Sequence, residues 1–107
     1  MITPIQLGQA AITASYAAIY TVPVSTSTYL KDMDVCNTTS ATVNLYVSIV
    51  PSAASPTASN SLFFNLPIPA YSTLQWTGTQ IMPANSTLQV KGSTTGLTIT
   101  ASGGAAT

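Results

Sequence analysis

The stretch VNLYVSIV, at residues 43–50, decides the fold class of this chain. Every second side chain in it is apolar, namely Val43, Leu45, Val47 and Ile49. A period of two is typical of a β-strand that buries one of its faces, because successive side chains of a strand point to opposite sides. We therefore expect a strand at residues 42–50.

Shorter patterns of the same kind occur on both sides of this strand. They predict further strands near 18–22, 29–36, 62–66, 72–77, 87–92 and 97–102. Pro67 and Pro69 interrupt the apolar row that begins at Leu62, so this strand should end near residue 66 or lie at a sheet edge. In 29–36 the alternation does not show which face is buried.

Turn-forming residues separate these segments at short intervals, which is typical of a sandwich or barrel. We expect residues 1–107 to form one all-β domain, a single antiparallel β-sandwich of about seven or eight short strands. Spacing alone does not separate a jelly roll from an immunoglobulin-like sandwich. Residues 1–12 are expected to be an N-terminal arm or the first strand, and residues 103–107 a flexible tail. The loop at 51–60 is long for a hairpin, so it should be either mobile or ordered by a partner.

Charged side chains are nearly absent. The 107 residues include two Lys and no Arg, two Asp and no Glu, and no His, so 4% of the chain is charged. An average soluble domain is about 25% charged, and charge is what keeps free proteins apart in solution. The composition therefore favours a homo-oligomer or a component of a larger assembly. The single Cys36 cannot form an intrachain disulfide and is expected in the core.

The composition also excludes several kinds of partner. A chain with two lysines has no basic patch with which to bind nucleic acid. Its apolar stretches are too short and too interrupted to span a membrane. The segment Met1-Ile2-Thr3-Pro4 lacks the basic residues and apolar run of a secretory signal, so we expect a protein made in the cytoplasm and used without that export route.

The residue types of this chain give little support for a catalytic function. A nucleophilic Ser, Thr or Cys needs a neighbouring base, and there is no His. Asp32 and Asp34, with Asn37, could hold calcium through oxygen ligands, but no calcium-loop motif surrounds them. The alternative, which we favour, is that both carboxylates face solvent or the lysines Lys31 and Lys91 of neighbouring strands. We expect no catalytic residue, metal site or cofactor.

The aromatic side chains allow two interpretations. They could form a platform on which sugar rings stack. We favour the alternative, in which Phe64 and Trp76 are core residues and the tyrosines lie at subunit contacts, where Tyr and Trp are enriched. Phe63 faces opposite to Phe64, so one of the two should be exposed and could anchor an interface. The candidate interface residues are Ile2, Ile5, Leu7, Phe63, Tyr71 and Trp76.

Five short segments resemble small β-rich virion proteins of tailed bacteriophages. They are Leu7-Gly8-Gln9, Ile19-Tyr20-Thr21-Val22-Pro23, Val35-Cys36-Asn37-Thr38-Thr39, Val47-Ser48-Ile49-Val50-Pro51-Ser52 and Ile68-Pro69-Ala70. The similarity spans most of residues 5–102, although each motif is short and built from common strand and turn residues. The chain departs from the family's V-P-S-G loop start by carrying Ala53 where the family has glycine.

The resemblance implies a β-sandwich that decorates or cements a capsid, or that forms part of a head or tail fibre. Our first hypothesis is a capsid decoration or cement protein of the virion, with the major capsid protein and copies of itself as partners. Residues 1–12 and 51–60 are the candidate segments for these contacts. The alternative is a head-fibre or tail-fibre module that binds host surface carbohydrate through exposed Tyr and Trp.

Overall fold

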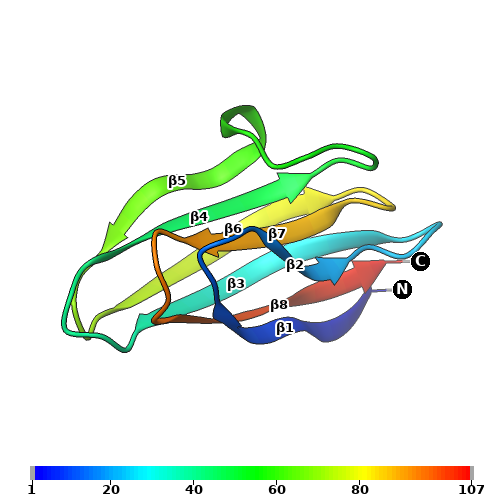
Figure 1. The fold of residues 1–107 in the computed structure, drawn as a ribbon. Helices are drawn as coiled ribbons and strands as arrows, with labels where there is room; N and C mark the ends of the chain where they lie inside the picture. Colours follow the sequence, from blue (N-terminus) through cyan, green and yellow to red (C-terminus); the bar gives the residue numbers. More distant parts are fainter. Residues whose placement is uncertain (1, 107) are drawn as a thin grey trace.

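Residues 2–106, which the computed structural model describes, form two antiparallel sheets of four strands each, packed face to face (Figure 1). The elements are β1 (Ile2–Ile12), β2 (Ala17–Thr21), β3 (Ser27–Asn37), β4 (Val43–Val50), a 3₁₀ turn η1 (Ala58–Asn60), β5 (Ser61–Ile68), β6 (Thr73–Met82), β7 (Thr87–Gly92) and β8 (Leu97–Ala106). The expected all-β sandwich is confirmed.

The strand order is that of a jelly roll. The first sheet runs β1-β8-β3-β6 and the second runs β2-β7-β4-β5. Strand β1 pairs with β8, β2 with β7, β3 with β6, and β4 with β5, so the chain is a long hairpin wound into two sheets. Only β4 and β5 are paired neighbours in the sequence, which distinguishes this order from an immunoglobulin-like sandwich built from successive hairpins.

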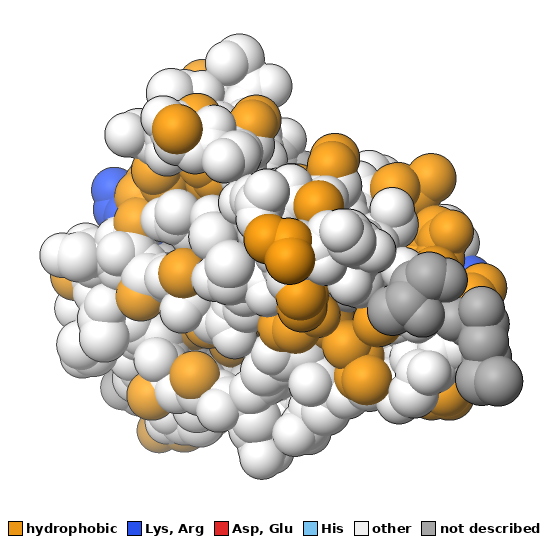
Figure 2. Space-filling view, turned by 90° about the vertical axis from the view of Figure 1, so that its right-hand side faces the viewer, with side chains coloured by type: hydrophobic (Ala, Val, Ile, Leu, Met, Phe, Trp, Pro, Cys, Tyr) orange, Lys and Arg blue, Asp and Glu red, His pale blue; other side chains and the backbone are white. Residues whose placement is uncertain are grey.

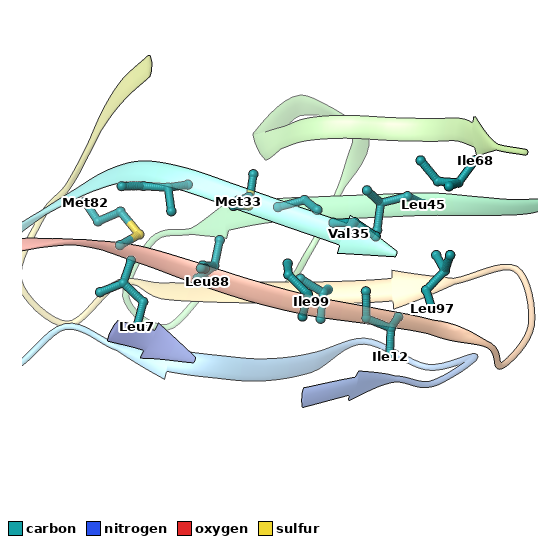
Figure 3. Close-up of a cluster of buried hydrophobic side chains, with 14 of the residues drawn as sticks. Leu7, Ile12, Met33, Val35, Leu45, Ile68, Met82, Leu88, Leu97 and Ile99 are labelled. Carbon is teal, nitrogen blue, oxygen red and sulfur yellow. The ribbon is translucent and has the colours of Figure 1, made fainter. Parts of the chain in front are cut away.

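The core lies between the two sheets and contains side chains from both (Figure 3). Alternation follows the prediction in β4 and β7, where Val43, Leu45, Val47, Leu88 and Val90 are all buried. These aliphatic side chains belong to one core cluster, and burial of each one stabilises the fold by about 1.5–3 kcal/mol.

A row of β-bulges crosses the first sheet. The pairing register shifts at Leu7 on β1 and at Lys31 on β3, each an extra residue relative to β8. Because one extra residue reverses the side to which later side chains point, β3 buries Leu30 before the bulge and Met33 and Val35 after it. The two faces of the strand predicted at 29–36 are therefore each buried over only part of its length.

A second bulge reverses the expected positions of the two phenylalanines. Leu45 pairs with Leu66 but Val47 pairs with Phe63, so β5 carries one more residue than β4 across this step. Asn65 takes up the extra residue with a positive φ of 55°. Phe63 consequently packs against the core, and Phe64 is 59% exposed. The expectation of a buried Phe64 and an exposed Phe63 is wrong because it assumed unbroken alternation.

The C-terminal segment is not a flexible tail. Residues 103–106 belong to β8 and pair with β1 on one side and β3 on the other. Gly103 is required here, since a Cβ atom would overlap the carbonyl oxygen of Tyr29. The N-terminal residues 2–12 form β1, the first strand, and the remaining part of the predicted tail, residue 107, lies outside the described residues.

The long loop at 51–60 folds back over the second sheet and is ordered by the chain itself. Asn60 Nδ2 donates to the Ser55 carbonyl at 3.0 Å, and its Oδ1 accepts from the Thr57 amide at 2.9 Å. Ser48 and Val50 are fully covered although they lie on the outer side of β4. These hydrogen bonds within the chain account for the conformation of the loop.

Candidate functional site

The acidic pair is joined by no third carboxylate, His or Cys among residues 2–106. Asp32 and Asp34 lie on the outer side of β3 and alternate with the inward Met33 and Val35. Among residues 2–106 no three His, Cys, Asp or Glu side chains come close enough to hold a metal ion together. Lys31 Nζ donates to Thr79 Oγ1 at 2.8 Å, whereas Lys91 is on β7 in the other sheet. The suggestion that Lys91 neighbours the two carboxylates is wrong.

Asn37 is a structural residue and not a ligand. It is 1% exposed, and its amide donates to the Ala41 carbonyl at 2.8 Å and to the Ile68 carbonyl at 2.9 Å. Its oxygen accepts from the amide and the hydroxyl of Thr39. All the hydrogen-bonding capacity of the side chain is used, so it cannot also bind calcium. Cys36 is half-buried on the outer side of β3, and the expectation of a core cysteine is wrong.

The six candidate interface residues do not form one surface. Ile2 is 60% exposed and Tyr71 is 73% exposed, and they lie on β1 and in the β5–β6 turn. Ile5, Phe63 and Trp76 are half-buried against the core, and Leu7 is a core residue at 4% exposure. Leu7 is therefore not available to a partner. The bulge at this position directs its side chain between the sheets.

Apolar side chains gather instead at the end of the sandwich where the chain termini lie. Val24 in the β2–β3 turn is 71% exposed and Ile81 near the end of β6 is 63% exposed, in addition to Ile2. Figure 2 views this end directly and shows apolar side chains exposed across it, in a surface that is mostly white, with lysine atoms visible only at its edges. We call Ile2, Val24 and Ile81 the apolar end.

A shallow hollow in the outer face of the first sheet adjoins the apolar end. Its volume is about 350 Å³, and it is lined by Ile2, Pro4, Tyr29, Lys31, Thr79, Gly103 and Gly104. Pro4, Gly104, Tyr29 and Ile81 are paired in one row across the four strands. Because the two glycines carry no side chains, the floor of the hollow is backbone. It could receive an apolar side chain of a neighbouring protein.

A second surface lies on the outer face of the second sheet. Four side chains line up across it in strand order: Tyr16 just before β2, Lys91 on β7, Tyr46 on β4 and Phe64 on β5. We call them the aromatic row. Tyr46 is paired with Lys91, and at about 4.8 Å per strand the row extends about 15 Å.

The side chains of the aromatic row contact one another. The rings of Tyr46 and Phe64 meet edge to face at a centroid distance of 5.3 Å, and those of Tyr16 and Tyr46 at 6.4 Å. Lys91 Nζ lies 4.7 Å from the centroid of Tyr46 and 5.3 Å from that of Tyr16. Such cation–π contacts stabilise a lysine by about 0.5–1 kcal/mol at an exposed site.

Two amides extend the row on its β5 side. Asn65 Oδ1 accepts from Asn44 Nδ2 at 2.8 Å and from the Tyr46 hydroxyl at 2.9 Å. The sequence already contained one signal for this surface, because Asn44 and Tyr46 alternate with buried residues of VNLYVSIV. The other members could not be found without the pairing of β4 with β5 and β7.

Comparison with known protein families finds no match for this chain, and neither does comparison with curated proteins or with solved structures. Within residues 2–106 there is no helix of the length and apolarity that a membrane crossing requires.

Proposed function

We propose that this chain is a structural protein of a bacteriophage virion, a capsid decoration or cement protein that binds the major capsid protein and copies of itself. The observation that carries the proposal is the apolar end. Ile2, Val24 and Ile81 are all at least 60% exposed in a chain of which 4% is charged. Exposed apolar surface on a chain with so few charges is typical of a protein–protein contact.

The physical chemistry of the surface agrees with a cementing role. The hollow beside the apolar end offers a cavity of about 350 Å³, large enough to seat an apolar side chain of a partner. Such knob-in-pocket contacts dominate the energy of interfaces. Jelly rolls occur in viral capsid proteins, but also in lectins and enzymes, so the fold itself adds only an analogy.

Sedimentation velocity of the isolated chain at micromolar concentration tests self-association. We expect an oligomer, and we expect Ile81→Asp to shift it toward monomer, because a carboxylate would be buried in the contact. Tyr71→Asp, at a similarly exposed position at the opposite end of the sandwich, is the matched control and should leave the oligomer intact. A monodisperse wild-type monomer would refute self-association.

A density map of purified virions tests the location in the particle. We expect density for the jelly roll at junctions between shell subunits, with the apolar end turned toward the shell. Density on a fibre, or on no part of the particle, would contradict the decoration hypothesis.

A second candidate function is favoured by the aromatic row. Exposed rings beside free amide groups can bind carbohydrate, as a head-fibre or tail-fibre module would on a host surface. The residues concerned are Tyr46 and Phe64. Of the aromatic side chains that the sequence offered as exposed candidates, Tyr71 is exposed but lies outside the row, and Trp76 is half-buried against the core. A glycan array without a hit for the wild-type protein would remove this candidate.

A further inference from the structure

We propose that the aromatic row on the outer face of the second sheet binds an acidic saccharide, with the saccharide carboxylate on Lys91 and a sugar ring against Phe64. This inference rests on the second candidate function and names its ligand class. It is independent of the decoration hypothesis, because the apolar end and the hollow are formed by other residues, mostly of the first sheet.

The aromatic part of the site is exposed by a feature of the fold. The bulge at Asn65 turns Phe64 outward, where it is 59% exposed and held edge to face by Tyr46. An exposed phenylalanine fixed in this way offers a rigid apolar surface at little cost in conformational entropy. The carbon–hydrogen face of a sugar ring is a flat apolar surface of matching size.

The amides beside Phe64 supply hydrogen bonds for hydroxyl groups. Asn65 Oδ1 already accepts two bonds, from Asn44 and Tyr46, which fixes the orientation of both amides. Asn65 Nδ2 and Asn44 Oδ1 make no hydrogen bond within residues 2–106. One free donor and one free acceptor therefore lie next to the exposed ring, and a sugar hydroxyl can satisfy either.

Lys91 selects an acidic ligand. Its ammonium group lies over two tyrosine rings and makes no hydrogen bond or ion pair with any described side chain. Both acidic residues of the chain, Asp32 and Asp34, are on β3 in the other sheet. The outer face of the second sheet thus carries one uncompensated positive charge, complementary to a carboxylate that approaches from solvent.

Lys91 also argues against a protein partner and against nucleic acid as the ligand of this face. Lysine is depleted from the centres of protein–protein interfaces, since covering it with an apolar surface removes its hydration without replacing it. Lys91 lies in the middle of the aromatic row, whereas Lys31 at the hollow is exposed and hydrogen-bonded to Thr79. A single lysine is also too little for nucleic acid, whose binding depends on several phosphate contacts. A saccharide keeps the ammonium group hydrogen-bonded, through both its carboxylate and its hydroxyls.

Titration calorimetry of the full chain tests the proposal. The acidic probes are oligogalacturonate, oligomannuronate, oligosialate and hyaluronan oligomers, and the neutral controls are maltooligosaccharides and galactan oligomers. We expect at least one acidic probe to bind, more weakly as salt rises, and no neutral control to bind equally well. Lys91→Gln and Phe64→Ala should each weaken binding about tenfold or more, the effect of losing one central contact.

Matched variants control for unspecific effects. Lys31→Gln removes the other lysine, on the opposite sheet, and Tyr71→Ala removes another exposed ring outside the row. Both should bind as wild type does. The proposal is overturned if no acidic probe binds, if Lys91→Gln binds as wild type does, or if a neutral probe binds equally well. It is also overturned if Lys91→Gln and Phe64→Ala alter the oligomeric state while no saccharide binds, which would assign the row to a protein contact.

Discussion

Replacing Asn37 with alanine should destabilise the fold by about 2.5 to 4.5 kcal/mol. The side chain is 1% exposed and joins the end of β3 in one sheet to Ile68 on β5 in the other. Its loss removes a buried hydrogen bond to the Ile68 carbonyl, and the loss of a buried hydrogen bond costs about 1–3 kcal/mol. The bonds to Ala41 and Thr39 are nearer to solvent, so water replaces part of each, and their loss adds about 0.5 kcal/mol each.

Urea unfolding at fixed protein concentration measures this loss. The single tryptophan, Trp76, is half-buried against the core and reports unfolding by its fluorescence. With an m-value of about 1.5 kcal/mol/M for a domain of this size, the midpoint should fall by about 2 M. Such a loss is a large part of a total stability of about 5–15 kcal/mol.

Asn44→Ala is the matched control for this variant. Asn44 is half-buried on the outer side of β4, and its side chain makes one hydrogen bond to a described residue, Asn65. We expect a loss below about 1 kcal/mol, because water can replace that bond. If Asn37→Ala loses no more than Asn44→Ala does, Asn37 does not tie the two sheets together and the reasoning fails.

Three further stability predictions use the same unfolding assay. Ala53 has a positive φ of 62°. Ala53→Gly should therefore stabilise the fold by about 0.5–1 kcal/mol, which is the strain of a left-handed alanine minus the extra chain entropy of glycine in the unfolded state. A urea midpoint equal to or lower than that of wild type would contradict this prediction. Phe63→Ala should cost about 2–3 kcal/mol, whereas Phe64→Ala should change stability by less than about 0.5 kcal/mol; the reverse order would mean that the bulge on β5 is wrongly placed. Gly103→Ala should cost more than about 2 kcal/mol, because its Cβ would overlap the backbone of Tyr29; a stability equal to that of wild type would show that β3 and β8 are not so closely paired there.

The strands themselves were largely predictable. Regular alternation placed β4 within one residue of its observed start and located β7 at 87–92, the bounds that it has in the structure. The prolines at 67 and 69 predicted that this strand either ends near residue 66 or lies at a sheet edge, because proline has no N–H to donate to a ladder. The structure shows the second alternative, since β5 is an edge strand that continues to Ile68. These features depend on the side chains of one segment and on its own backbone, and they can be inferred without knowing its partner.

The candidate surfaces were predictable only in part. Ile2 and Tyr71 are exposed as expected, but Leu7 is in the core and Phe64 takes the place of Phe63 at the surface. Each error arises at a bulge, where the partner strand and not the sequence of the bulged strand sets the register. The aromatic row likewise depends on pairing, since Tyr46 and Lys91 are far apart in the chain and adjacent in the sheet.

The amino-acid sequence by itself determined that this protein is all-β, and that its surface is almost free of charge, because both follow from residue types and their local period. Tertiary structure alone decided the winding of the strands into a jelly roll, the side to which residues point beyond each bulge, and the ordering of residues 103–106 between two strands. The physical reason is that hydrogen-bond register and side-chain neighbours in a sheet are set between segments distant in the chain, so no local pattern contains them.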